Sequence, residues 1–161
     1  MSKLNNCQFI EVKIDNKAVA GSSEESAYKN WMEGYASPGL ETLSGPDGIF
    51  FTDVQTSILV TKETSKLYEN YLQRGHKEIT ITIVHRGSDK YEKNYEIQRT
   101  VFNTCNFLGL KFAQHDEKLF MVLSFTFEGT VEVTFNVPNA DETSLDKIGP
   151  IKYDIPQKKI L

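Results

Sequence analysis

The chain has 161 residues, of which 39% are hydrophobic and 11% aromatic, and 18 basic against 22 acidic residues give a formal net charge of −4. This length suits a single domain with a proper core, and the aromatic content excludes a disordered chain. The densest basic cluster is Lys158-Lys159, which argues against nucleic-acid binding. We therefore expect one globular domain over residues 1–161.

The N-terminal sequence and the apolar runs bear on targeting. MSKLNNCQFIEVKI has neither an uninterrupted apolar stretch nor a small-residue cleavage site, so we expect no Sec signal peptide. No run approaches the roughly 20 apolar residues that span a bilayer, so we expect no membrane insertion. Cys7 and Cys105 have no metal-ligand spacing, and without a secretory signal they predict reduced, buried thiols in the cytoplasm. Residues 1–6 are expected to be flexible.

The first half of the chain predicts short strands separated by loops. Polar residues fill the segment 20–30, and the segment 36–49 contains three Gly, two Pro and a Pro-Asp-Gly turn. Both segments are expected to be loops, and the second is unusually long for a compact domain. Strands are expected at residues 7–14, 31–35 and 50–61.

One helix is predicted, over about residues 65–74. Thr64 or Ser65 supplies its N-cap, and Arg74 followed by Gly75 ends it. The apolar stripe of this helix is expected to consist of Leu67, Tyr71 and Leu72.

The second half predicts longer strands and a polar end. Residues 77–86 alternate, with Ile79, Ile81 and Ile83 on one face. Residues 91–105 form another strand whose alternation slips at 102–106, which predicts a bulge, and residues 108–112 continue it. The segment 138–161 is expected to be a polar C-terminal extension.

The clearest pattern spans Leu123 to Val137, where apolar and polar residues alternate. A period of two over this length predicts one long antiparallel strand with a buried face and a wet face. The polar side includes Ser124, Thr126, Glu128, Thr130 and Glu132, and the apolar side comprises Leu123, Phe125, Phe127, Val131, Val133, Phe135 and Val137. The predicted fold class is all-β: a β-barrel of two packed antiparallel sheets with one flanking helix.

No constellation of residues points to catalysis or to a cofactor. His76, His85 and His115 lie far apart and lack ligand spacing, and Cys105 is expected to be packed in a strand and not to act as a nucleophile. There is no phosphate-binding loop and no Ser-His-Asp pattern. We expect no enzyme activity, metal or cofactor. A barrel of the lipocalin or fatty-acid-binding kind, with a small apolar ligand inside, stays open as an alternative, and an enzyme stays open as a third.

Three ordered segments carry a resemblance to a known family. Gly21 to Glu33 fits G-x-S-x-[acid]-x-x-H-K-x-W-[aliphatic]-E, with Tyr28 in place of His. Lys62 to Leu67, followed by Gly75-His76, fits an acid-x-(S/T)-S-x-x-L…G helix signature. Phe125 to Phe135 fits an F-S-Y-E-K-I-x-W-x-Y strand with one extra residue near Gly129 and Val133 in place of Trp. The tail adds Lys147-Ile148-Gly149-Pro150, Tyr153 and Lys158-Lys159. In this order the segments resemble the Hcp proteins, the tube subunits of bacterial type VI secretion.

The resemblance implies a structural role. Subunits would close into hexameric rings, rings would stack into a tube within a contractile sheath and beneath the spike protein VgrG, and effectors would travel in the lumen. The protein would be cytoplasmic before assembly and then secreted without a Sec signal. A phage tail-tube protein shares this architecture and stays open as an alternative.

Three sets of residues are expected to matter for such a role. Long strands without visible edge protection suggest that barrel edges hold the ring. In the long loop, Pro38, Gly39, Leu40 and Leu43 are expected to dock on an adjacent copy, the alternative being that the leucines fold back on their own barrel. The polar row from Ser124 to Glu132 is expected to line the lumen or to meet solvent. Trp31 is expected to be a buried structural anchor.

Overall fold

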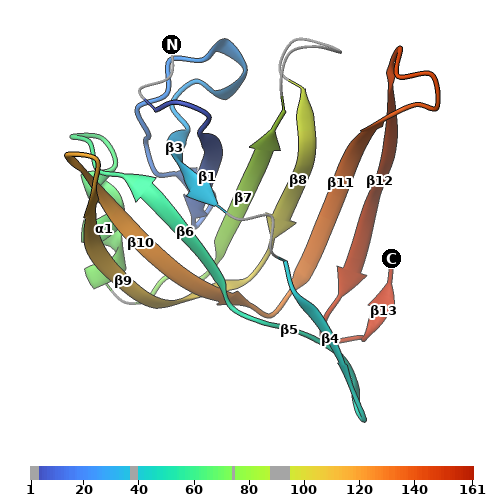
Figure 1. Cartoon of the computed structure of the whole chain (residues 1–161). Coiled ribbons are helices and arrows are strands. Elements are labelled where there is room, and N and C mark those ends of the chain that lie inside the picture. Colours follow the sequence, from blue (N-terminus) through green and yellow to red (C-terminus); the bar gives the residue numbers. More distant parts are fainter. Residues whose placement is uncertain (1–3, 37–39, 74, 88–94) are drawn as a thin grey trace.

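The computed structural model describes residues 4–36, 40–73, 75–87 and 95–161. Within them the chain forms β-strands, one α-helix and one short 3₁₀-helix (Figure 1). The elements are β1 (Gln8–Ile14), β2 (Lys17–Ala18), η1 (Ser26–Tyr28), β3 (Met32–Ala36), β4 (Thr42–Gly45), β5 (Gly48–Phe51), β6 (Val54–Leu59), α1 (Ser65–Leu72), β7 (Ile79–Arg86), β8 (Glu96–Phe102), β9 (Cys105–His115), β10 (Lys118–Phe127), β11 (Thr130–Pro138), β12 (Leu145–Asp154) and β13 (Lys159–Ile160).

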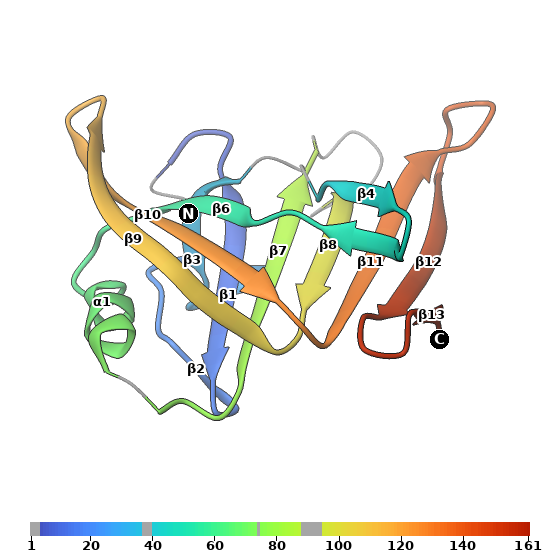
Figure 2. The same cartoon turned by 90° about the horizontal axis from the view of Figure 1, so that it is seen from below.

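One antiparallel sheet of eleven strands dominates the molecule. Its hydrogen-bonded order is β13-β12-β11-β8-β7-β1-β3-β6-β10-β9, with β2 beside β1, while β4 and β5 form a separate hairpin. The sheet bends so that β9 and β10 lie on one side and β11 and β12 on the other, with β1, β7 and β8 between them (Figures 1 and 2). The predicted all-β class with one flanking helix is confirmed, although the two expected sheets are two limbs of one sheet.

The alternating segment from Leu123 to Val137 is two strands and not the single strand predicted. β10 ends at Phe127 and pairs with β6 and β9, whereas β11 begins at Thr130 and pairs with β8 and β12. The chain turns a corner at Glu128-Gly129. The alternation continues through the corner because the odd-numbered residues face the interior in both strands: Phe127 is 7% exposed and Val131 3%.

A second corner, at Asn103-Thr104, replaces the bulge predicted at residues 102–106. It joins β8 to β9, and residues 91–94 of the predicted strand lie outside the described residues. The two corners are hydrogen-bonded to each other. The N–H of Glu128 donates to the Thr104 carbonyl (3.0 Å), that of Gly129 to the Asn103 carbonyl (3.2 Å) and that of Asn103 to the Thr130 carbonyl (2.9 Å). The two limbs of the sheet therefore diverge from one fixed point.

Apolar side chains pack on both faces of the sheet. The larger cluster fills the interior, and at the corners the ring of Phe102 lies 5.3 Å from that of Phe125 and 4.8 Å from that of Phe127. Ile79, Ile81 and Ile83 point into this cluster, as predicted. A smaller cluster on the opposite face consists of Leu4, Cys7, Phe9, Tyr28, Leu59, Val84 and Phe120.

The chain start is held by this smaller cluster. Leu4 is 4% exposed, and its N–H donates to the buried carboxylate of Glu33 (3.3 Å). The hydroxyl of Tyr35 donates to the Asn5 carbonyl (3.1 Å). Leu4 therefore packs in a core, the flexibility expected for residues 1–6 stays a prediction, and residues 1–3 lie outside the described part.

Two predicted irregular segments contain strands. Residues 42–51 form the β4–β5 hairpin around a turn at Pro46-Asp47, because the turn residues allow the flanking residues to pair. The turn was predicted, but the loop was wrong over this range. The C-terminal extension contains β12, which pairs with β11 from Leu145 to Asp154 because its sparse apolar residues face those of β11. The predicted strand 50–61 is divided into β5 and β6.

The helix is shorter than predicted, and its inward face matches the predicted stripe at Leu67 and Tyr71 but not at Leu72. It ends at Leu72, and Arg74 lies outside the described residues. Leu67 is buried and Tyr71 partly buried, but Leu72 is 62% exposed. Tyr68 packs inward instead, with its ring 5.1 Å from that of Phe112. The Thr64 hydroxyl holds the preceding turn, accepting from the Thr61 N–H (2.7 Å) and donating to the Leu59 carbonyl (2.8 Å), and makes no cap bond to the helix.

The joined corners give a stability prediction. A Cβ at Gly129 would lie 2.6 Å from Thr104 Oγ1 and 3.1 Å from the Asn103 carbonyl oxygen. Gly129→Ala should therefore lower the free energy of unfolding by about 1–3 kcal/mol, as overpacking does, measured by urea denaturation. Gly109→Ala is the matched control, because nothing lies within 4 Å of its Cβ. Equal effects of the two changes would show that the corner contact is unimportant.

Candidate functional site

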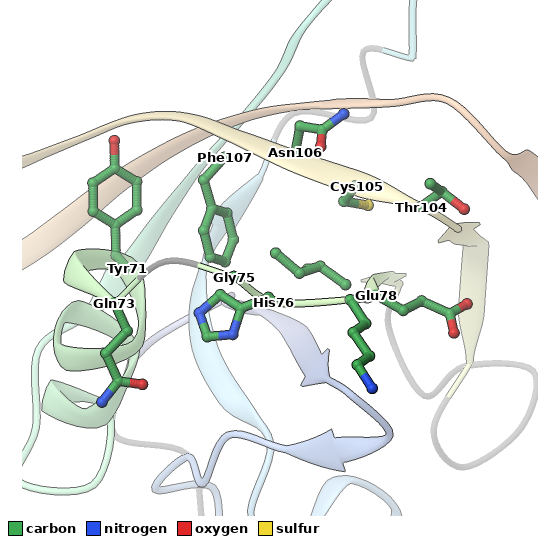
Figure 3. A pocket seen from close by; sticks show the side chains of 11 residues that line it. Tyr71, Gln73, Gly75, His76, Glu78, Thr104, Cys105, Asn106 and Phe107 are labelled. Carbon is green, nitrogen blue, oxygen red and sulfur yellow. The ribbon is translucent and has the colours of Figure 1, made fainter.

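One cavity lies between α1, the start of β7 and β9 (Figure 3). It has a volume of about 490 Å³. His76 lies on its wall, with Nε2 2.8 Å from the Asn70 carbonyl oxygen. Cys105, also on the wall, is 4% exposed, and burial raises the pKa of its thiol to about 12. The burial of Cys105 agrees with the prediction that it is packed in a strand, and a raised pKa favours the protonated thiol at neutral pH.

The three histidines are not brought together as metal ligands. His76 precedes β7, His85 lies within β7, and His115 ends β9 beside the exposed carboxylate of Asp116 (3.3 Å). Among the residues that the structure describes, no group of three His, Cys, Asp or Glu side chains is placed to hold a metal ion. No helix in the described ranges is both long enough and apolar enough to cross a membrane.

A half-buried ionic cluster was missed by the sequence analysis. The Tyr28 hydroxyl donates to the Glu96 carboxylate (2.5 Å), and Arg99 donates two hydrogen bonds to the same carboxylate at 3.0 Å each. Burial favours protonation of Glu96, but the hydrogen bonds from Arg99 and Tyr28 outweigh it and hold the pKa of Glu96 below its usual value. Burial and the bond to Glu96 raise the pKa of Tyr28. Tyr28 and Glu96 are 68 residues apart, so no local pattern could have revealed the pair.

Trp31 lies at the border of this cluster. It is partly buried against the smaller core, its ring meets that of Tyr28 edge-on at 5.5 Å, and the Arg99 guanidinium lies 5.6 Å from its ring centre. The ring of Tyr28 is more deeply buried than that of Trp31: Tyr28 is 1% exposed and stacks on the fully buried Phe9 with ring centres 4.5 Å apart. The anchor role predicted for Trp31 is therefore shared with Tyr28.

The two leucines of the long segment lie in different surroundings. Leu40 packs against the interior cluster and, with Ile83, His85 and Phe102 among others, lines a small cavity of about 10 Å³. Leu43 lies on the β4–β5 hairpin and is 36% exposed, and its cross-strand partner Phe50 is 51% exposed. Pro38 and Gly39 lie outside the described residues.

The polar row expected to line a lumen is divided by the corner. Ser124 and Thr126 lie on β10, Glu128 at the corner, and Thr130 and Glu132 on β11. All have the parity opposite to the buried residues. Glu128 is exposed and the other four are partly buried. The row therefore belongs to two limbs of the sheet that diverge, and does not form one straight wall.

Both long strands near the ends of the sheet are bulged. In β9, Gly109 pairs with Ser124 and Phe107 with Phe125, so Leu108 is an extra residue. In β12, Ile148 pairs with Phe135 and Ile151 with Val133, which places Gly149-Pro150 opposite a single residue. Pro150 also lacks an N–H to donate. Bulges and prolines are features that blunt sheet edges, so each of these two strands is interrupted at one point, although β9 keeps a regular register from Gly109 to His115.

The Glu96 cluster predicts a pH-dependent contribution to stability. A carboxyl whose pKa is lowered in the folded state stabilises the fold above its unfolded pKa of about 4.3, and loses that contribution as pH falls through the folded value. Glu96→Gln should lower the free energy of unfolding at pH 7 by about 1–2 kcal/mol, and its difference from the parent should shrink below pH 4. Urea denaturation across pH 3–7 tests this. Glu69→Gln, at an exposed ion pair with Lys66, should change little, and a pH-independent loss for Glu96→Gln would contradict the assignment.

Comparisons with known proteins identify solved structures that share this fold. No family model matches the sequence, and no curated protein matches it. Among solved structures, Hcp1 from Salmonella typhimurium superposes with a TM-score of 0.64 at 18% identity, over 96% of this chain and 99% of that one. A type VI secretion system effector from Yersinia pestis gives 0.61 at 16% identity, over 91% and 99%. The secreted protein Hcp3 from Pseudomonas aeruginosa gives 0.57 at 12% identity, over 93% and 98%.

These likenesses cover nearly the whole of each chain and agree with the ordered motifs of the sequence. At such identities they establish the fold. They confirm in three dimensions the resemblance predicted from Gly21–Glu33, the helix and the Phe125–Phe135 segment. This chain has the fold of the Hcp proteins of type VI secretion systems.

Proposed function

We propose that this chain is a structural subunit of a type VI secretion tube, which assembles into hexameric rings that stack and are propelled from the cell. The observation that carries the proposal is the match to Hcp structures along the full length of both chains, with 95% of this chain and 99% of a type six secretion system protein superposed at a TM-score of 0.65. Its partners would be further copies of itself, VgrG, the contractile sheath and effectors carried in the lumen. The protein would begin in the cytoplasm and leave the cell without a Sec signal.

The side chains support a mechanical role without catalysis. The thiol of Cys105 is buried and protonated, and the ionic groups of the Glu96 cluster are engaged with one another. The polar row formed by Ser124, Thr126, Glu128, Thr130 and Glu132 faces away from the apolar interior on both limbs of the sheet, which suits a surface in contact with water. We infer that this row lines the lumen.

The cavities of the fold bear on the alternative of a ligand-binding barrel. The cavity beside Leu40 holds only about 10 Å³, and the cavity of about 490 Å³ between α1, β7 and β9 opens to the surface and has polar residues such as Gln73, His76 and Glu78 on its wall. A lipocalin-like carrier needs an apolar chamber of about 300–1,000 Å³ within its barrel, so this geometry disfavours that alternative. A phage tail-tube protein shares the proposed architecture. The genes beside this one discriminate, because a type VI tube requires sheath and VgrG genes of that system.

Ring formation gives the first test of the proposal. A hexamer of 18.3 kDa chains should elute with a mass about six times that of the monomer. Size-exclusion chromatography with light scattering, at micromolar protein and at two salt concentrations, measures this directly. A strictly monomeric mass under all conditions would overturn the proposal.

The hairpin gives the second test. We propose that Leu43 docks on an adjacent copy during stacking, because it is 36% exposed on a hairpin that projects from the sheet (Figure 1), whereas Leu40 packs on its own core. Leu43→Ser should prevent tube formation in electron micrographs and leave ring mass and melting temperature unchanged. Leu40→Ser is the contrasting variant, and should lower the melting temperature because it opens the interior. Normal tubes from Leu43→Ser would exclude the docking role.

A further inference from the structure

The hydrophobic core covers only part of the inner face that β11 and β12 share. Residues directly opposite one another in an antiparallel pair share a face, and the successive pairs on this face are Val131 with Tyr153, Val133 with Ile151, and Phe135 with Ile148. Val131 is 3% exposed, but exposure rises along the strands to 47% at Ile151 and 44% at Ile148. We define the open face as Val133, Phe135, Val137, Ile148 and Ile151.

A second apolar surface lies on the other limb. Tyr68 on α1 packs on Phe112 of β9, and Leu72 follows one helical turn later. Leu119 on β10 shares the face of Phe112, because it pairs with Gln114, two residues further along β9. Leu72 is 62% exposed, Phe112 48% and Leu119 46%. We define the helix patch as Tyr68, Leu72, Phe112 and Leu119.

The two surfaces lie at opposite ends of the molecule. Both views place α1 with β9 at one end and β11 with β12 at the other (Figures 1 and 2). Apolar patches of a few hundred Å² on a soluble chain commonly mark interaction sites. Two unlike patches at opposite ends suit a head-to-tail contact between identical copies, which closes into a ring when the rotation allows.

The edges of the sheet favour the same conclusion. The bulge at Leu108 in β9 and the Gly149-Pro150 bulge in β12 interrupt the backbone hydrogen-bonding rows that a neighbouring strand would need. A long uninterrupted ladder between copies through these two strands is therefore unfavourable. Contact through side chains meets no such obstacle.

We propose that the open face of one copy packs against the helix patch of the next, so that apolar side chains hold the ring together and not a sheet continued from copy to copy. This rests on the proposed function as a ring-forming subunit. A stable interface buries about 800 Å² on each partner, with an apolar centre and a polar rim. The two patches would supply the centre, and the polar turns at 139–144 and 116–117 would supply the rim.

Charge substitutions test the two surfaces. Ile148→Lys and Leu72→Lys should each shift the mass measured by light scattering from ring to monomer. Melting temperatures should stay near that of the parent, because Ile148 is 44% and Leu72 62% exposed. Ile97→Lys is the matched control: Ile97 is 46% exposed on β8, outside both surfaces. Rings that persist in both test variants would overturn the proposal, and so would a control that dissociates equally.

Cross-linking tests the pairing itself, even for variants that assemble poorly. Cys7 and Cys105 are 6% and 4% exposed, so the native thiols give little background. Ile148→Cys combined with Leu72→Cys should give covalent multimers up to the hexamer with a short bismaleimide, and either change alone should not. Rings of wild-type mass without cross-links would overturn this interface and leave the proposed function intact. A wild-type chain that stays monomeric would instead overturn the tube subunit role on which this inference depends.

Discussion

Three backbone hydrogen bonds between the corners at Asn103-Thr104 and Glu128-Gly129 hold the architecture together. They join the ends of β8 and β10 to the starts of β9 and β11, so each limb of the sheet leaves from the same point. Phe102, Phe125 and Phe127 fill the angle between the limbs. The direction in which the limbs diverge decides how much apolar surface the interior covers and how much it leaves open.

Strands with buried faces could be predicted from the sequence because their alternation is local. Ile79, Ile81 and Ile83 are an example. The corner at Gly129 could not be predicted, because apolar residues keep the same parity on both sides of it. An alternation of period two does not show whether the strand changes direction. β12 was missed for a different reason: its apolar residues are sparse and half exposed, so its composition resembles that of a tail.

For the predicted site residues, the local pattern again indicates which face a residue lies on but not which elements it meets. The polar parity of Ser124 to Glu132 was correctly read as facing away from the core, but its division between two limbs depends on the corner. Leu40 and Leu43 look equivalent in sequence and differ in burial, because only Leu40 lies over the interior. The contact of Tyr28 with Glu96 depends on the pairing order of the strands, which no spacing encodes. Identities of 12–18% with chains of the same fold indicate that few residue identities are needed to form such a sheet.

The pairing order also has a consequence for synthesis. β6 pairs with β10 and β8 pairs with β11. In each pair the second strand lies later in the chain, so it leaves the ribosome after the first. Contacts of high sequence separation form slowly, and a partly made sheet presents bare strands to other chains. The segment that contains β1, β3, β6 and β7 is complete before β9 and β10 are made, so part of its inner side stays uncovered until the apolar residues of β10, such as Met121, Leu123 and Phe125, emerge. We expect this to be the stage of its life at which the chain is most prone to aggregation and has most need of a chaperone.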